Sequence, residues 1–193
     1  MIDGSRAIGT DSALCVEERG TASGIDDRIS QASGRWWVLH TRARNEKAVA
    51  LALAHQQVMY YLPLVRVERT YAKCRVTVLL PLFPGYLFLC GDHDTCEKAW
   101  STKRVANILR VEDQGQLRAE LRQVCLAVES GEKVDVFKSL SRGRRCRITG
   151  GPLRGLEGVM LRRGHRCRMF LCVTILGQSA VVEVDGALLE PID

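Results

Sequence analysis

The chain has 193 residues, of which 46% are hydrophobic and 26% are charged, a composition typical of one globular domain or two small ones. It contains no run of about 18 apolar residues, and its N-terminal stretch lacks the basic start and apolar segment of a signal peptide, so we expect neither a membrane span nor secretion. The eight cysteines do not show the dense spacing of a disulfide-rich secreted protein, so we expect reduced thiols and a cytoplasmic location.

The net charge of +6 is distributed unevenly along the chain. Residues 1–34 contain three arginines and six acidic residues, whereas residues 35–118 contain thirteen basic and seven acidic residues. Residues 142–168 contain nine arginines and a single acid, Glu157. Two basic segments separated by a nearly neutral one indicate two bodies that face a polyanion such as nucleic acid. A soluble basic protein without a nucleic-acid partner is the alternative interpretation.

The N-terminal half is expected to begin with a tail and to continue as one folded domain. Residues 1–34 are rich in Gly, Ser, Asp and Arg without periodicity, so we expect a disordered tail. The elements expected after it are, in chain order, a strand at 36–41, a helix at 46–57, a strand at 58–62, a hairpin with arms at 64–71 and 73–80, a strand at 87–90, a helix at 94–101 and a strand at 105–111. This order predicts an α+β domain over residues 35–115, with helices packed against a sheet.

The segment from Pro81 to Cys90 predicts a tight bend that leads into an aromatic strand. Pro84 has a fixed φ and no backbone donor, and Gly85 permits the bend. Phe83 and Tyr86 flank it. Core packing is one interpretation of these two aromatic residues, and a docking surface for another protein is the other.

The C-terminal half predicts a helix, a linker and an all-β unit. Apolar residues recur at three- and four-residue steps over 116–130, which is typical of a helix, and the polar stretch 131–141 is expected to be a linker. Residues 142–193 contain five glycines between positions 143 and 158, followed by strand-like segments at 167–176 and 180–184. Short strands joined by glycine turns predict a small closed barrel.

Cys90, His93 and Cys96 have a spacing that zinc ligands use. No fourth ligand follows nearby, and Cys90 ends a buried strand, so ordinary buried thiols are favoured over a metal site. A cysteine–histidine nucleophile would need an activating geometry that a sequence does not reveal. We therefore predict no catalytic residue, no metal and no cofactor, and a protein that is not an enzyme.

The C-terminal unit resembles the KOW motif, a glycine-rich signature of small SH3-like barrels. The matching residues are Gly143, Ile148, Gly151, Pro152, Leu153, Gly155, Gly158 and Val159. Cys146 stands where valine is more usual. Because the motif also occurs in ribosomal proteins, it does not define a function by itself.

The front half resembles the NGN domain of the NusG family. The segments that carry the resemblance are 36–41, 45–47, 62–64 and 82–88. An NGN domain followed by a KOW domain is the architecture of that family, and the resemblance covers residues 35–193. The segment 81–88 is more similar to the specialised, RfaH-like paralogues than to general NusG.

The resemblance implies a transcription elongation factor that modulates pausing, termination or antitermination. In the family, the NGN domain binds the clamp helices of the RNA polymerase β′ subunit and touches non-template DNA near the transcription bubble. The positions that match the clamp-helix contact are Val38, His40, Phe83 and Tyr86. The positions that match the DNA contact are Arg42, Arg44, Lys103 and Arg104. The KOW domain of the family recruits a ribosomal protein or the terminator Rho, and we expect a monomer.

An RNA-binding protein of the KOW type that acts on the ribosome is the alternative function, favoured by the basic residues at 142–168. The sequence leaves open whether the factor acts generally or at a few operons, and whether it promotes pausing or antitermination. Strand-forming residues such as Val173 and Ile175 favour a stable β barrel in the free protein, rather than a domain that refolds into helices as in RfaH.

Overall fold

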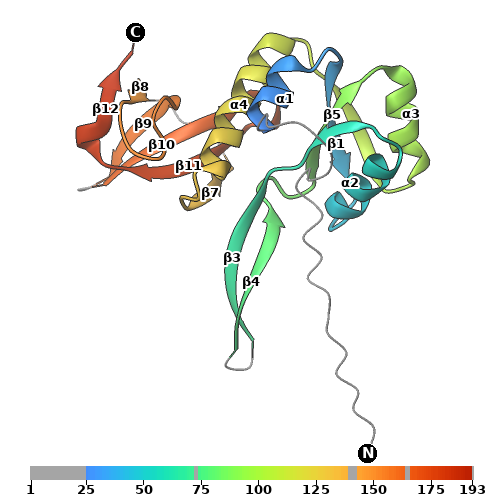
Figure 1. Ribbon diagram of the computed structural model, residues 1–193, viewed down its shortest axis with the longest axis horizontal. Coiled ribbons are helices and arrows are strands. Elements are labelled where there is room, and N and C mark those ends of the chain that lie inside the picture. The colour runs from blue at the N-terminus through green and yellow to red at the C-terminus, as the bar shows by residue number, and fades with distance from the viewer. Residues whose placement is uncertain (1–24, 72–73, 139–142, 164–165, 193) are drawn as a thin grey trace, which may run out of the picture.

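The computed structural model describes residues 25–71, 74–138, 143–163 and 166–192 (Figure 1). Most of the predicted N-terminal tail, residues 1–24, lies outside this range. At residues 25–31 the prediction of disorder is wrong, because they form helix α1 (Ile25–Gln31). Ile29 is buried in the core, and Arg118 donates a hydrogen bond of 3.1 Å to the carbonyl oxygen of Ala32. These anchors are tertiary contacts, and too few apolar residues precede Gly34 for a helical period to show in the sequence.

The N-terminal domain is a four-stranded antiparallel sheet in the order β2-β5-β1-β6, covered by helices on both faces (Figure 1). Its strands are β1 (Arg35–Thr41), β2 (Met59–Tyr61), β5 (Tyr86–Gly91) and β6 (Val105–Arg110), and its helices are α2 (Glu46–His55), α3 (His93–Ser101) and α4 (Gln114–Glu129). Side chains on one face of the sheet pack with α2 and α3, and those on the other face pack with α1 and α4. The predicted strands and helices of this domain are present, with ends shifted by one or two residues.

Strand β1 shows why both faces must be covered. Trp36 and Val38 belong to the core on the α4 side, whereas Trp37 and Leu39 belong to the core on the α2 side. Successive side chains of a strand point to opposite faces, so four large apolar residues in a row require a layer on each side.

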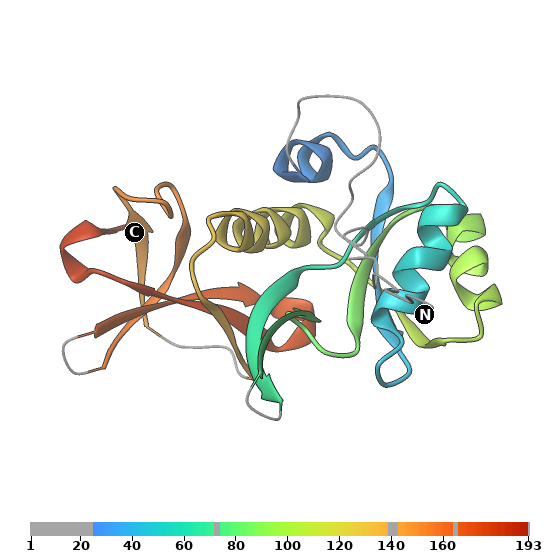
Figure 2. The same ribbon diagram turned by 60° about the horizontal axis from the view of Figure 1, so that its bottom comes forward.

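The hairpin predicted at 64–80 is present as β3 (Leu64–Tyr71) and β4 (Cys74–Pro81), which form a separate two-stranded sheet. It projects from the N-terminal domain (Figures 1 and 2). The backbone N–H of Leu82 donates a hydrogen bond of 2.8 Å to the carbonyl oxygen of Pro63 and closes its base. We call this hairpin the arm.

The C-terminal domain is a six-stranded antiparallel sheet in the order β12-β8-β9-β10-β11-β7. Its elements are β7 (Val134–Phe137), β8 (Arg144–Ile148), β9 (Glu157–Arg163), β10 (Arg166–Val173), β11 (Gln178–Val184) and β12 (Leu189–Pro191), with short 3-10 helices η1 (Thr174–Leu176) and η2 (Gly186–Leu188). Strand β12 follows β11 and η2 in the chain, but it pairs with β8, at the edge of the sheet opposite β7. The predicted fold class, an α+β domain with an antiparallel sheet followed by an all-β domain, is confirmed.

The predicted linker at 131–141 is wrong at residues 134–137, because they form β7 and pair with β11. Val134 is buried, whereas Asp135 and Phe137 are exposed. An edge strand of four residues with a polar residue in it lacks the length that would distinguish it from a loop. The remainder of the predicted linker includes residues 139–142, which lie outside the described residues.

Helix α4 joins the two domains (Figure 2). Its apolar residues Leu117, Leu121 and Val124 lie in a core cluster that contains residues of both sheets. Its polar residues also bond to the C-terminal domain: Glu120 accepts a hydrogen bond of 3.1 Å from the backbone N–H of Thr174. The segment predicted as a helix between two domains is therefore shared by their cores. No helix among the described residues is long and apolar enough to span a membrane.

The predicted bend is held by a buried carboxylate. Gly85 has a left-handed φ of 85°, and its N–H donates a hydrogen bond of 2.6 Å to Oε1 of Glu46, the first residue of α2. Glu46 is only 6% exposed. The N–H of Thr41 donates to the carbonyl oxygen of Gly85 at 2.8 Å. The end of β1 and the start of α2 together fix the bend.

The role of Glu46 is testable by two substitutions. Glu46→Ala leaves the partly buried N–H of Gly85 without its acceptor, so we expect a loss of about 1–3 kcal/mol of unfolding free energy. Glu46→Gln keeps an acceptor oxygen and should lose less. Urea unfolding followed by tryptophan fluorescence measures both variants, and equal losses would contradict a role for the hydrogen bond.

The N-terminal cap of α3 gives a pH-dependent test. Asp92 accepts hydrogen bonds from the N–H of Thr95 at 2.9 Å and from its hydroxyl at 2.6 Å, and chiefly the hydroxyl lowers the pKa of Asp92. A carboxylate with a lowered pKa contributes stability above its unfolded pKa and loses it as pH falls through the folded pKa.

We therefore expect the melting temperature of the wild type to exceed that of Asp92→Ala at neutral pH, and the difference to shrink in acid. Asp92→Asn, which caps without titrating, should be less destabilising than Asp92→Ala at neutral pH. Thermal melts at a series of pH values measure these differences. A gap between the wild type and Asp92→Ala that does not change with pH would contradict the role of the carboxylate.

Candidate functional site at one end of the N-terminal sheet

Pairing registers bring the predicted site residues to one end of the N-terminal sheet. His40 pairs with Tyr86 of β5, and Thr41 pairs with Val105 of β6. The end of β1, the bend before β5 and the loop before β6 therefore lie side by side. The arm leaves the domain next to the same bend, since β4 ends at Pro81.

The four residues that match a clamp-helix contact divide into a surface pair and a buried pair. His40 is exposed and Tyr86 is partly exposed, and their rings stack with centroids 4.9 Å apart at an interplanar angle of 23°. Val38 and Phe83 are fully buried, and Phe83 packs edge-on against Phe88. The surface of this site is therefore the histidine–tyrosine stack, and the buried pair supports it from the core.

The four residues that match a DNA contact come together from two loops about 60 positions apart in the sequence. The N–H of Arg42 donates a hydrogen bond of 2.8 Å to the carbonyl oxygen of Arg104. Nη1 of Arg104 donates to Oδ1 of Asn45 at 2.7 Å. Arg42, Arg44, Lys103 and Arg104 are all exposed. We call these four side chains the basic loops.

Sequence reasoning did not foresee the part that Asn45 plays. Asn45 occupies the position before α2, but its side chain makes no cap hydrogen bond. Its amide instead accepts from Arg104 and donates to the carbonyl oxygen of Ala43 at 3.0 Å. Asn45 thus joins the two basic loops. Its place in the segment 45–47, which carries part of the family resemblance, was the available signal.

Each basic loop contains one residue in a strained backbone conformation. Arg44 has φ 59° and Lys103 has φ 57°, both in the left-handed region. This region costs a residue with a Cβ roughly 1–2 kcal/mol and is usually occupied by glycine. Strained residues of this kind cluster at functional sites, where the surrounding structure holds them in place.

The residues of the predicted KOW motif span β8, the turn after it and the start of β9. Gly151 and Gly155 have left-handed φ values of 76° and 89°. A Cβ on Gly158 would lie 2.7 Å from the carbonyl oxygen of Phe170, so this position accepts only glycine without a shift of the backbone. Ile148 is buried, whereas Pro152 is exposed on the turn. The glycines of the motif therefore shape the turn and its approach to β10, while Pro152 lies on the surface.

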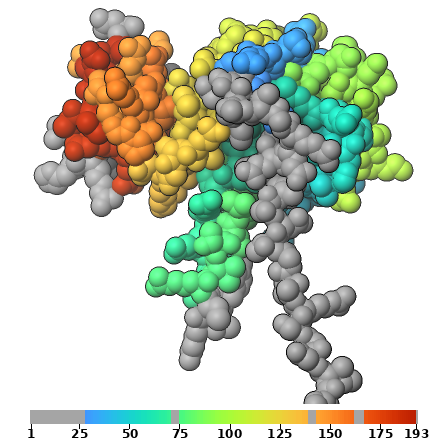
Figure 3. Space-filling model, viewed as in Figure 1, coloured from blue at the N-terminus to red at the C-terminus, as the bar shows by residue number. Residues whose placement is uncertain are grey.

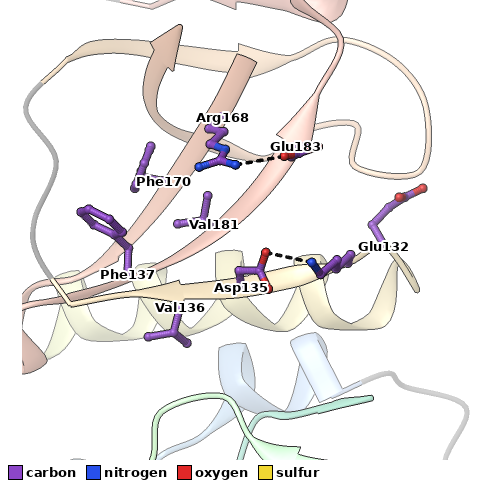
Figure 4. A pocket seen from close by; sticks show the side chains of 9 residues that line it. Glu132, Asp135, Val136, Phe137, Arg168, Phe170, Val181 and Glu183 are labelled. Carbon is purple, nitrogen blue, oxygen red and sulfur yellow. Dashed lines mark hydrogen bonds and ion pairs between the residues drawn. The ribbon is translucent and has the colours of Figure 1, made fainter. Parts of the chain in front are cut away.

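An open hollow of about 420 Å³ lies on the C-terminal sheet, far along the chain from the basic loops (Figure 4). Phe137 and Phe170 meet edge to face in it, with centroids 5.6 Å apart. Arg168 and Glu183 form an ion pair of 3.3 Å at its rim. Charged residues, among them Glu132, Lys133 and Asp135, line the hollow together with these rings.

The predicted thiols Cys90 and Cys96 are both buried, and burial is the main cause that raises the pKa of each. His93 between them is exposed and packs edge-on against Trp37, with centroids 5.2 Å apart. Within the part of the chain that the structure describes, no group of three or more His, Cys, Asp or Glu side chains gathers as a metal site would require.

Comparisons with known proteins gave a family match and a structural match. A family model described as transcription termination factor NusG matches residues 34–123. A solved structure titled "Domain interaction in Thermotoga maritima NusG" is 15% identical in sequence and covers 83% of this chain and 98% of its own, with a TM-score of 0.47. A search of curated proteins found no match. The N-terminal part of the chain, residues 34–123, is therefore similar to the NusG family of transcription factors.

Proposed function

We propose that this protein is a transcription elongation factor that binds RNA polymerase through its N-terminal domain and modulates pausing, termination or antitermination. The observation that carries the proposal is the shared end of the N-terminal sheet. An aromatic stack and four exposed cations, which lie far apart in sequence, meet there beside a projecting arm. A protein surface and a nucleic-acid strand can therefore be engaged together.

The aromatic part of this end is suited to a helical protein partner. We propose that the clamp helices of the polymerase β′ subunit dock over His40 and Tyr86. Aromatic residues at the centre of an interface contribute large contact area at low entropic cost, because they have few rotatable bonds. Val38 and Phe83 lie beneath the stack and keep it rigid, which reduces the ordering cost of binding.

The basic part is suited to a nucleic-acid backbone. We propose that Arg42, Arg44, Lys103 and Arg104 contact phosphates of the non-template strand near the transcription bubble. Their exposure leaves the charges available, and the bond between the two loops fixes their spacing. Contacts of this kind tolerate any sequence and weaken as salt rises.

A factor that holds both the clamp and the DNA bridges the two sides of the polymerase cleft. Bridging favours the closed clamp by its differential affinity for that state, so no catalytic group is required. We propose that the C-terminal KOW-like domain recruits a further partner, either a ribosomal protein or Rho. The protein then acts as a monomeric, non-enzymatic adaptor in the cytoplasm.

The protein contact is tested by removing the aromatic stack. We expect His40→Ala/Tyr86→Ala to weaken binding to core RNA polymerase from the same organism by about 2 kcal/mol, or roughly 30-fold. Trp100→Ala is the matched control, because Trp100 is an aromatic residue 46% exposed on α3. Fluorescence titration of labelled full-length protein measures the affinities. If the folded wild type does not bind, or if the control loses as much as the double variant, the proposed docking site is wrong.

The DNA contact is tested by the salt dependence of binding to an elongation complex. Loss of two phosphate contacts in Arg42→Gln/Lys103→Gln should reduce the slope of log affinity against log salt by about 1.5. Arg110→Gln is the control, because Arg110 pairs with Trp37 at the opposite end of the sheet. An unchanged slope in the double variant would contradict the assignment of DNA to the basic loops.

A further inference from the structure

The arm is amphipathic across its two faces. Cross-strand partners lie on the same face of a hairpin, and successive residues alternate between faces. The pairs Val65 with Leu80, Val67 with Val78, and Arg69 with Val76 form one face, which is apolar in five of its six positions. The pairs Arg66 with Leu79, Glu68 with Thr77, and Thr70 with Arg75 form the other face, which is mainly polar. We call them the apolar face and the polar face of the arm.

Only the base of the apolar face is packed into the protein. Val65 packs against the core cluster that contains Phe83 and Val38. Further out the arm stands clear of both domains (Figures 1 and 3), and Val76 is 44% exposed. A two-stranded hairpin is marginally stable by itself, and clustered apolar residues on a surface mark an interaction site.

The apolar face is continuous with the proposed polymerase site. Leu80 lies on this face, and Leu82, two residues further, is buried in the core cluster with Phe83 and Val38, against which Val65 also packs. Tyr86 packs against that same cluster from the surface. The strip from Val76 through Leu80 therefore leads to the bend and to the histidine–tyrosine stack on one side of the molecule.

We infer that the apolar face of the arm is a second part of the polymerase docking surface, and that the clamp helices lie along it. This inference rests on the proposed function. Eight residues of strand span roughly 26 Å, which is the length of about 17 residues of α-helix. A long helical hairpin could therefore contact the stack with one segment and the arm with another. The polar face, with Arg66 and Arg75, then stays in solvent.

Two substitutions on the apolar face test this without removing the strand. Val67→Thr/Val78→Thr changes a directly opposed pair to β-branched residues of similar shape, so strand propensity is kept while apolar surface is lost. We expect polymerase binding to weaken roughly tenfold. Glu68→Thr is the matched control. Because Glu68 pairs with Thr77, this substitution also creates an opposed threonine pair, at the next register position but on the polar face. This control should bind like the wild type.

A cross-linking experiment gives a readout that does not depend on affinity. p-Benzoylphenylalanine is placed at Val78 in one protein and at Thr77 in another, in the full chain bound to core polymerase. We expect irradiation to link position 78, and not position 77, to the β′ subunit. Mass spectrometry then locates the linked segment.

The outcomes separate the two proposals. Failure of the wild type to bind polymerase overturns the proposed function and this inference with it. Normal binding by the wild type and by Val67→Thr/Val78→Thr, with no link from position 78, overturns only the role of the arm. A link from position 78 to a second copy of this chain, or equal links from positions 77 and 78, also overturns it.

Discussion

The organisation of this protein depends on the complete enclosure of strand β1. It pairs with β5 on one edge and β6 on the other, and its apolar residues are buried on both faces. A strand enclosed in this way can present side chains to a partner only where it leaves the sheet. His40 and the loop after Thr41 are at that exit, which is why the aromatic stack and the basic loops share one end of the domain.

The first residue of α2 connects the two halves of this end. Asn45 joins the basic loops, and Glu46 beside it binds the backbone of the bend that carries Tyr86. A buried carboxylate is costly unless its oxygens accept hydrogen bonds, so Glu46 specifies one position of the bend relative to α2. The histidine–tyrosine stack and the basic loops are in this way set at a fixed spacing by two adjacent residues. A single rigid end of this kind is suited to a partner whose protein and nucleic-acid parts are themselves fixed relative to each other.

Much of the fold was predictable because local signals agreed with it. The alternation in the arm, the proline and glycine of the bend and the carboxylate of Asp92 each determine a local geometry, and all three are present. The two elements that were not predicted, α1 and β7, depend on tertiary contacts. Helix α1 depends on contacts with α4, and β7 depends on the free edge of β11. The burial of the site residues likewise depends on contacts with residues that are distant in the sequence.

For the site, the sequence showed that Phe83 and Tyr86 flank the bend. It did not show that Phe83 is buried in the core whereas Tyr86 reaches the surface. Alternation gives the face to which a side chain points, but the layer that covers that face is formed by residues distant in sequence. Phe83 is enclosed in a core cluster to which α4 and the C-terminal sheet contribute, whereas Tyr86 stacks on His40 at the exit of β1. The buried member of the pair therefore could not be identified from the sequence alone.

The basic loops place exposed cations at two left-handed backbone positions. Glycine at positions 44 and 103 would relieve the left-handed strain, at roughly 1 kcal/mol for each residue. The chain instead has Arg44 and Lys103 there, both exposed. Exposed cations contribute little to the free energy of folding. The charges of Arg44 and Lys103 therefore do not offset the cost of their backbone conformation. Gln57 has a similar left-handed φ of 56° without a charge, and the N–H of Lys103 bonds to the carbonyl oxygen of Trp100 at the end of α3, where left-handed residues are common. The feature of these loops that supports the role proposed for this end of the sheet is therefore their exposed charge.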